Sequence, residues 1–296
     1  MRKWGLFLFG GWATVTLGLF LAIVAGTVAE AQFSIIGNGQ KLIQAVVMSV
    51  IVVPAILYLY RRMFQQIGKT EKPAHALNHM PHFFTGFLLV IVLTVTSLFS
   101  FNTLGLITIE QWHTPQSWIG ALLLNMLIAF FYEALPEELA VRGLIYDVLH
   151  LRLSVWQSVL VQALIFIAFS ASISLLLVMT GISPASSIAA LPSQLILHFF
   201  FGIALALIRV WTGSLWAAIG FHLGYLAMAR FLLMPTEYGA PPVVTYQDTI
   251  MQGVGGSLAV MFIILGTIFL LLILLGIRTV LRRKDKHRGS RPKNLI

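Results

Sequence analysis

The 296-residue chain contains no cysteine and very little charge, with Asp, Glu, Lys and Arg making up only 10% of its residues. The absence of cysteine excludes disulfides, thiolate metal sites and cysteine nucleophiles. The scarcity of charge excludes an ordinary water-soluble domain, in which about 25% of residues are charged. Hydrophobic residues make up 58% of the chain and its mean hydropathy is +0.91. This composition predicts a polytopic membrane protein built as one helical domain.

Eight apolar runs are long enough to cross a bilayer as helices. They cover residues 4–29, 42–60, 83–105, 117–135, 155–180, 190–210, 213–233 and 254–277. Eight spans place both termini on one side, and if that side is the cytoplasm, every Lys and Arg except Lys41 and Arg230 lies inside. The first run is too long for the apolar region of a signal peptide, so we expect it to remain as an uncleaved span. The pattern predicts an all-α bundle of about eight transmembrane helices over residues 1–277, with both termini cytoplasmic.

The formal net charge of +9 does not indicate nucleic acid, because the basic residues are concentrated in the tail at residues 278–296. A basic tail directly after a membrane span typically faces anionic lipid on the cytoplasmic side. We therefore expect anionic lipid as the partner of this tail. The inner-face charge and the absence of cysteine suit a bacterial plasma membrane.

The fourth apolar run leads into a cluster of charged residues, Glu133, Glu137, Glu138 and Arg142. Ionisable groups inside a membrane are costly, so they are usually paired and functional. Glu138 and Arg142 are four residues apart and can pair on one helical face. Because Arg142 pairs with Glu138, the Glu137 carboxylate is not committed to this nearest cation. Glu137 is therefore the candidate general base of a site inside the bundle.

Two histidines lie in the sixth and seventh predicted spans, His198 and His222. Gly220 and Gly224 flank His222, and small residues four apart allow another helix to approach closely. Each histidine could simply join two helices by a hydrogen bond. Together with Glu137, a histidine could also bind and activate a water molecule, alone or on a divalent metal. A proton-coupled transporter, here with its proton site at Glu133 and Glu137, also keeps acids and histidines in its spans, so both functions stay open.

Two motifs in this region resemble those of a known family. Glu137, Glu138 and Arg142 match a Glu-Glu-x-x-x-Arg motif, and the Thr-Gly-Ser-Leu-Trp stretch at residues 212–216 leads to His222. With these motifs, residues of about 120–235 resemble the CAAX protease and bacteriocin-processing family, whose members are similar to type II CAAX prenyl endopeptidases. The resemblance implies an intramembrane endopeptidase, classed with the metalloproteases, that hydrolyses a membrane-associated peptide or protein.

The same resemblance implies a role for each matched residue. Glu137 would activate water, Glu138 and Arg142 would shape the site, and His222 would bind a zinc-like divalent metal or stabilise the oxyanion. The sequence departs from the family pattern at two positions, since Ser170 stands where the Phe-x-x-x-His motif has histidine and Leu226 where the His-x-x-x-Asn motif has asparagine.

One histidine could compensate for the first of these losses. At 1.5 Å per residue, His198 and His222 both fall near mid-depth in antiparallel spans. We therefore expect His198 to stand in for the missing histidine beside Glu137, where it could serve as a second metal ligand. The alternative is a catalytically silent relative that binds a peptide or protein partner in immunity or regulation.

Overall fold

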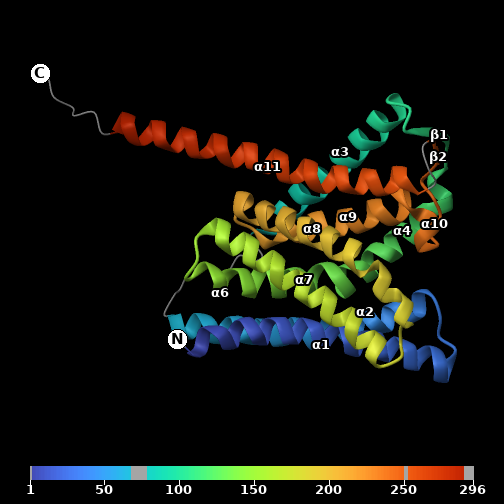
Figure 1. Ribbon diagram of the computed structural model, residues 1–296, viewed down its shortest axis with the longest axis horizontal. Coiled ribbons are helices and arrows are strands. Elements are labelled where there is room, and N and C mark those ends of the chain that lie inside the picture. Colours follow the sequence, from blue (N-terminus) through green and yellow to red (C-terminus); the bar gives the residue numbers. More distant parts are fainter. Residues whose placement is uncertain (1, 68–78, 250–252, 290–296) are drawn as a thin grey trace, which may run out of the picture.

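The computed structural model of the protein describes residues 2–67, 79–249 and 253–289. Eight helical segments in these ranges are long and apolar enough to cross a membrane, which confirms the predicted all-α bundle. They are Trp4–Phe33, Asn38–Ile67, His82–Thr103, Pro115–His150, Val155–Met179, Ala185–Thr212, Leu215–Leu233 and Val254–Leu281. Helix α1 (Arg2–Phe33) begins at the same end of the bundle at which α11 (Val254–Gly289) finishes (Figure 1).

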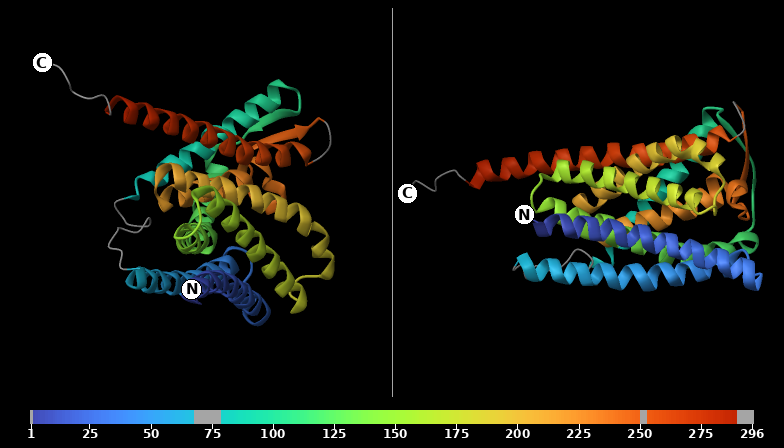
Figure 2. Two further views of the ribbon diagram at one scale, coloured as in Figure 1. Left: turned by 60° about the vertical axis from the view of Figure 1, so that its left-hand side comes forward. Right: turned by 60° about the horizontal axis from the view of Figure 1, so that its bottom comes forward.

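We call that end of the bundle the terminus end. The opposite end is the sheet end, where β1 (Ile107–Trp112) pairs with β2 (Val244–Asp248) (Figures 1 and 2). Which end faces the cytoplasm remains a prediction from the charge pattern. The other elements are α2 (Asn38–Ile67), α3 (His82–Thr103), α4 (Pro115–Ala129), η2 (Phe130–Ala134), α5 (Leu135–Glu138), η3 (Leu139–Ile145), α6 (Tyr146–His150), α7 (Val155–Met179), η4 (Ala185–Ala190), α8 (Leu191–Thr212), α9 (Leu215–Met228), η5 (Ala229–Leu233) and α10 (Pro235–Tyr238).

The fourth span is longer than predicted, because the helix continues from residue 115 to residue 150 instead of stopping near 135. The charged residues that end the apolar run in the sequence are buried inside the bundle, so the helix continues beyond them instead of ending at the membrane surface. Two widened, π-helical segments, η2 and η3, flank the short α5 that carries Glu137 and Glu138. π-Helical segments are rare overall, and those that occur often lie at functional sites.

The core surrounds α9, which packs closely against α3. A Cβ added at Gly220 would lie 2.0 Å from the carbonyl oxygen of Phe83, and one added at Gly86 would lie 1.9 Å from that of Ala217. Both contacts are with backbone, which cannot rotate aside. The close helix approach predicted at Gly220 and Gly224 is therefore confirmed, with α3 as the neighbouring helix.

We expect Gly220→Ala to lower the free energy of unfolding by about 1–3 kcal/mol, because the methyl group forces α3 and α9 apart. Gly276→Ala is the matched control, since a Cβ at Gly276 meets no atom within 4 Å. There, replacing glycine in a helix should be neutral or stabilising by about 0.5–1 kcal/mol. Denaturant unfolding in detergent micelles measures both variants, and equal stability of the two would contradict the close packing.

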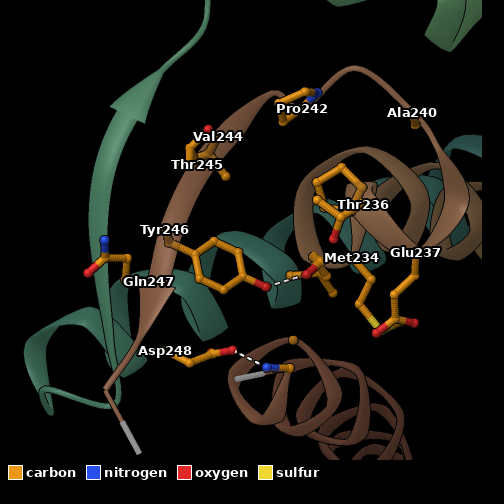
Figure 3. A pocket seen from close by; sticks show the side chains of 14 residues that line it. Met234, Thr236, Glu237, Ala240, Pro242, Val244, Thr245, Tyr246, Gln247 and Asp248 are labelled. Carbon is orange, nitrogen blue, oxygen red and sulfur yellow. Dashed lines mark hydrogen bonds between the residues drawn. The ribbon is translucent and has the colours of Figure 1, made fainter. Parts of the chain in front are cut away.

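The sheet end is more ordered than the sequence predicts, since the prolines within residues 234–252 indicate a long external loop. Within its described part, this segment contains α10 and the strand β2, whose Asp248 lies opposite Ile107 of β1. The Tyr246 hydroxyl donates a hydrogen bond to the Leu233 carbonyl, and Asp248 accepts one from the backbone N–H of Gly253 (Figure 3). The two-stranded sheet thus ties the α3–α4 connection to the start of α11.

Candidate functional site

A buried triad of charged and polar side chains forms the base of the site. The Glu138 Oε1 atom lies 3.0 Å from Arg142 Nη1 and 2.9 Å from His222 Nδ1. Glu138 and Arg142 are fully buried and His222 is 3% exposed. The Arg142 guanidinium also lies over the ring of Phe166, 4.1 Å from its centre. The predicted Glu138–Arg142 ion pair is therefore present, and it holds His222 as well.

Glu137 lies one residue before this triad but faces a different direction. Its side chain is 8% exposed and forms no hydrogen bond or ion pair with another residue in the described part of the chain. It lines a cavity of about 100 Å³ together with His198 and His222. The geometry is consistent with the expectation that Glu137 stays uncommitted to a cation. A carboxylate in this position can accept a proton from a water molecule or a substrate.

His198 is held by the serine that replaces the histidine of the family motif. Ser170 Oγ lies 2.9 Å from His198 Nδ1, and the Phe166 ring contacts the imidazole edge-on with ring centres 5.4 Å apart. Ser170, His198 and Glu137 line a second, adjoining cavity of about 330 Å³. The hypothesis that His198 comes near Glu137 and His222 is thus consistent with the structure.

A second ion pair, which the sequence did not reveal, lies beside the catalytic candidates. Arg230 Nη2 contacts both carboxylate oxygens of Glu133, at 2.7 and 2.9 Å, and its Nη1 lies 3.5 Å from the Asn125 oxygen. Glu133 and Arg230 belong to π-helical segments of different spans, and both line the larger cavity. The predicted topology assigns Arg230 to the external side, so its pairing with Glu133 was not predicted. The signal available in the sequence was the position of Arg230 inside the apolar run 213–233.

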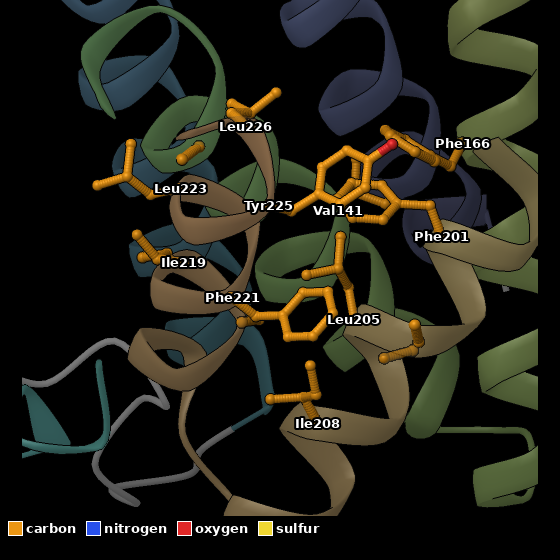
Figure 4. Close-up of a cluster of buried hydrophobic side chains, with 14 of the residues drawn as sticks. Val141, Phe166, Phe201, Leu205, Ile208, Ile219, Phe221, Leu223, Tyr225 and Leu226 are labelled. Carbon is orange, nitrogen blue, oxygen red and sulfur yellow. The ribbon is translucent and has the colours of Figure 1, made fainter. Parts of the chain in front are cut away.

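Leu226 lies one helical turn after His222 and also lines the smaller cavity. The side chain is apolar, so it supplies no hydrogen bond at the position where the family motif has asparagine. Phe201 contacts the His222 and Tyr225 rings, with centres 5.0 and 4.6 Å apart. Figure 4 shows Phe201, Tyr225 and Leu226 at one side of the apolar cluster between α8 and α9.

Among the residues that the structure describes, the side chains of the site do not supply the three ligands of an enzymatic zinc centre. Within the described ranges, no group of three or more His, Asp or Glu residues has a geometry that could hold a metal ion. Glu138 already binds Nδ1 of His222, and Ser170 contacts Nδ1 of His198, so each imidazole retains one nitrogen for another ligand. Zinc sites in enzymes generally use three protein ligands. The residues present therefore do not form such a set.

The terminus end of the site is closed by a separate network. Arg209 of α8 lies 2.5 Å from Asp147 Oδ1 and donates to the Gly143 carbonyl at 3.3 Å. The Tyr60 hydroxyl donates to the other oxygen of Asp147 at 2.9 Å. The network joins α2, η3, α6 and α8, and so fixes the segment that carries Arg142.

Comparison with known proteins identifies the family of this region. Residues 115–228 match the family model described as type II CAAX prenyl endopeptidase Rce1-like, whereas no curated protein and no solved structure matches the chain. The matched range runs from the start of α4 to the end of α9, so it contains Glu137, Glu138, Arg142, His198 and His222. The resemblance predicted from the two motifs is confirmed over this range. The chain is therefore an integral membrane protein, and its residues 115–228 are similar to the Rce1-like family of proteases.

Proposed function

We propose that this protein is a CAAX-type intramembrane endopeptidase that hydrolyses a membrane-associated peptide or protein. The observation that carries the proposal is the position of Glu137, a carboxylate without an ion-pair partner among the described residues, in one cavity with His198 and His222. A structural role alone gives no reason to place such a carboxylate inside a bundle, where charge is costly.

Glu137 can act as the general base. It accepts a proton from a water molecule, whose oxygen attacks the scissile carbonyl carbon and forms a tetrahedral intermediate. The C–N bond then breaks, and the proton held by Glu137 passes to the leaving amine. Positioned acid–base catalysis of this kind contributes about 10²–10⁴-fold to a rate.

His222 can stabilise the negative oxygen of that intermediate. A carboxylate only accepts hydrogen bonds, so the Glu138 contact places a proton on Nδ1 of His222. In the charged form of the ring, Nε2 also carries a proton and can donate to the oxyanion while Nδ1 stays on Glu138. Arg142 and Glu138 thus act by positioning His222, without touching the substrate.

His198 takes the place of the lost motif histidine, with Ser170 as its positioning residue. We expect His198→Ala to lower the cleavage rate about 100-fold. Ser170→Ala should lower it only about 10-fold, because this change removes the contact that orients the His198 imidazole but leaves the imidazole in place. The control is His150→Ala, an exposed histidine at the terminus end. Quenched fluorescent transmembrane and farnesylated CAAX peptides in lipid nanodiscs measure the rates.

Two outcomes of that assay oppose the proposal. Full activity of His198→Ala would remove His198 from the mechanism. Absence of any Glu137-dependent cleavage by the native protein, over a broad peptide set, would favour the catalytically silent relative that binds a partner. Flux of protons in liposomes that fails in Glu133→Gln would instead favour a transporter.

A divalent metal remains a prediction from the resemblance. The resemblance names His222, with His198 as a second candidate, as its ligands, which are fewer than the three protein ligands that zinc enzymes generally use. Metal analysis of purified protein tests this, because a stoichiometric ion that is lost in His222→Ala would establish the site. Anionic lipid at the basic tail and a bacterial plasma membrane likewise stay proposals.

A further inference from the structure

The larger cavity beside Glu137 extends toward the sheet end of the bundle. Ser174 is five residues from the sheet end of α7, which at 1.5 Å per residue is about 7 Å. Gln194 is three residues from the sheet end of α8. Arg230 lies in η5, which follows the sheet end of α9. The cavity thus extends from Glu137 in one direction only.

Exposure along the cavity rises in the same direction. Glu137 and Ser170 are 8% and 7% exposed, Ser174 is partly exposed, and Gln194 is exposed. The Glu133–Arg230 pair that lines the cavity is also partly exposed, with side chains 20% and 16% exposed. Charged side chains at membrane depth face protein or a water-filled cavity, because contact with lipid is too costly. These charged and polar side chains favour water over lipid as the content of the cavity.

The opposite direction is filled with packed side chains. One to two turns from Phe201 along α8 lie Leu205 and Ile208, and next to His222 on α9 lies Phe221. Leu205, Ile208 and Phe221 are at most 1% exposed, and they interlock between the two helices (Figure 4). Beyond them, Arg209 and Asp147 form the network described above. Leu205, Ile208 and Phe221 line neither of the two cavities that contain Glu137.

We propose that water and substrate reach Glu137 from the sheet end, through the cavity between α1, α7 and α8. The identity of the substrate rests on the proposed function, whereas the route for water does not. The substrate is then a peptide that presents its scissile bond from the half of the membrane near the β1–β2 sheet. With the termini in the cytoplasm, as the charge pattern predicts, this is the extracytoplasmic half.

The absence of cysteine makes the route directly measurable, because any single thiol introduced into the full chain is the sole one. Ser174→Cys reports on the cavity, Gln111→Cys marks the sheet end and Gln157→Cys marks the terminus end. Leu175→Cys is the matched control, since Leu175 is 46% exposed on the neighbouring face of α7 at the same depth. A membrane-impermeant maleimide is applied to intact cells and to inverted vesicles, and total thiol is counted after unfolding.

We expect Ser174→Cys to react in the same preparation as Gln111→Cys, and Gln157→Cys to react in the other. Leu175→Cys should react at least about tenfold more slowly than Ser174→Cys, because lipid keeps the reagent away. Reaction of Ser174→Cys together with Gln157→Cys, or as slowly as Leu175→Cys, would overturn the route. Labelling needs no catalysis, so a protein with the expected pattern but no peptidase activity would refute the proposed function alone.

Discussion

Replacing Glu137 by glutamine should lower the rate of peptide cleavage by about 10²–10⁴-fold, the range supplied by a positioned general base. The amide has nearly the same shape but cannot accept the proton from water. Stability should not fall, because Glu137 has no ion-pair partner in the described chain to lose. Cleavage of a quenched peptide in nanodiscs measures the rate, and denaturant unfolding in detergent measures the stability.

Glu110→Gln is the matched control for this change. Glu110 is an exposed carboxylate on β1, outside both cavities, so its replacement should leave cleavage unchanged. Equal activity of Glu137→Gln and the native protein would show that another group activates water. Equal loss in both variants would show that the assay responds to net charge rather than to a base.

Removing Glu138 should have the largest effect on stability. Glu138→Leu leaves the fully buried guanidinium of Arg142 without its carboxylate, and breaking a buried ion pair in this way costs about 3–5 kcal/mol. The Phe166 ring beneath Arg142 compensates for only a small part, since such contacts contribute about 0.5–2 kcal/mol. His222 would lose its partner as well, so cleavage should fall with stability.

The double variant Glu138→Leu/Arg142→Met separates this explanation from simple loss of packing. It replaces both charges with apolar side chains, and replacement of a whole buried pair is often close to neutral. We therefore expect the double variant to be more stable than Glu138→Leu alone, while remaining inactive. If the double variant loses as much stability as Glu138→Leu and Arg142→Met lose together, these two residues have no net electrostatic coupling. Denaturant unfolding of the four proteins in one detergent provides the comparison.

The sequence predicts the bundle well because hydropathy and charge act locally. An apolar run of about 20 residues has few alternatives to a membrane span, so all eight were found. The end of the fourth span and the β1–β2 sheet were not predicted, since both depend on partners that are distant in sequence. Glu138 can lie inside the helix because His222 and Arg142 surround it, and β2 forms because β1 lies beside it.

In the candidate site as well, features that depend on nearby residues could be predicted from the sequence, whereas contacts between distant residues could not. The i,i+4 spacing of Glu138 and Arg142 predicts their pair, and the family motifs pick out Glu137 and His222. The Glu133–Arg230 pair joins residues 97 positions apart and could not be predicted from spacing. The Ser170–His198 contact shows how a residue of the next helix could replace the lost histidine. From the sequence alone, the helical rise per residue predicts the depth of His198 in the bundle but not this contact.

Comparison of the peptide termini in membranes that contain native protein or Glu137→Gln tests the central claim most directly, because the substrate does not have to be identified beforehand. Terminal labelling and mass spectrometry should find new termini in native membranes that are missing from the Glu137→Gln membranes. Identical termini in the two membranes, at equal protein levels, would contradict hydrolysis by this carboxylate.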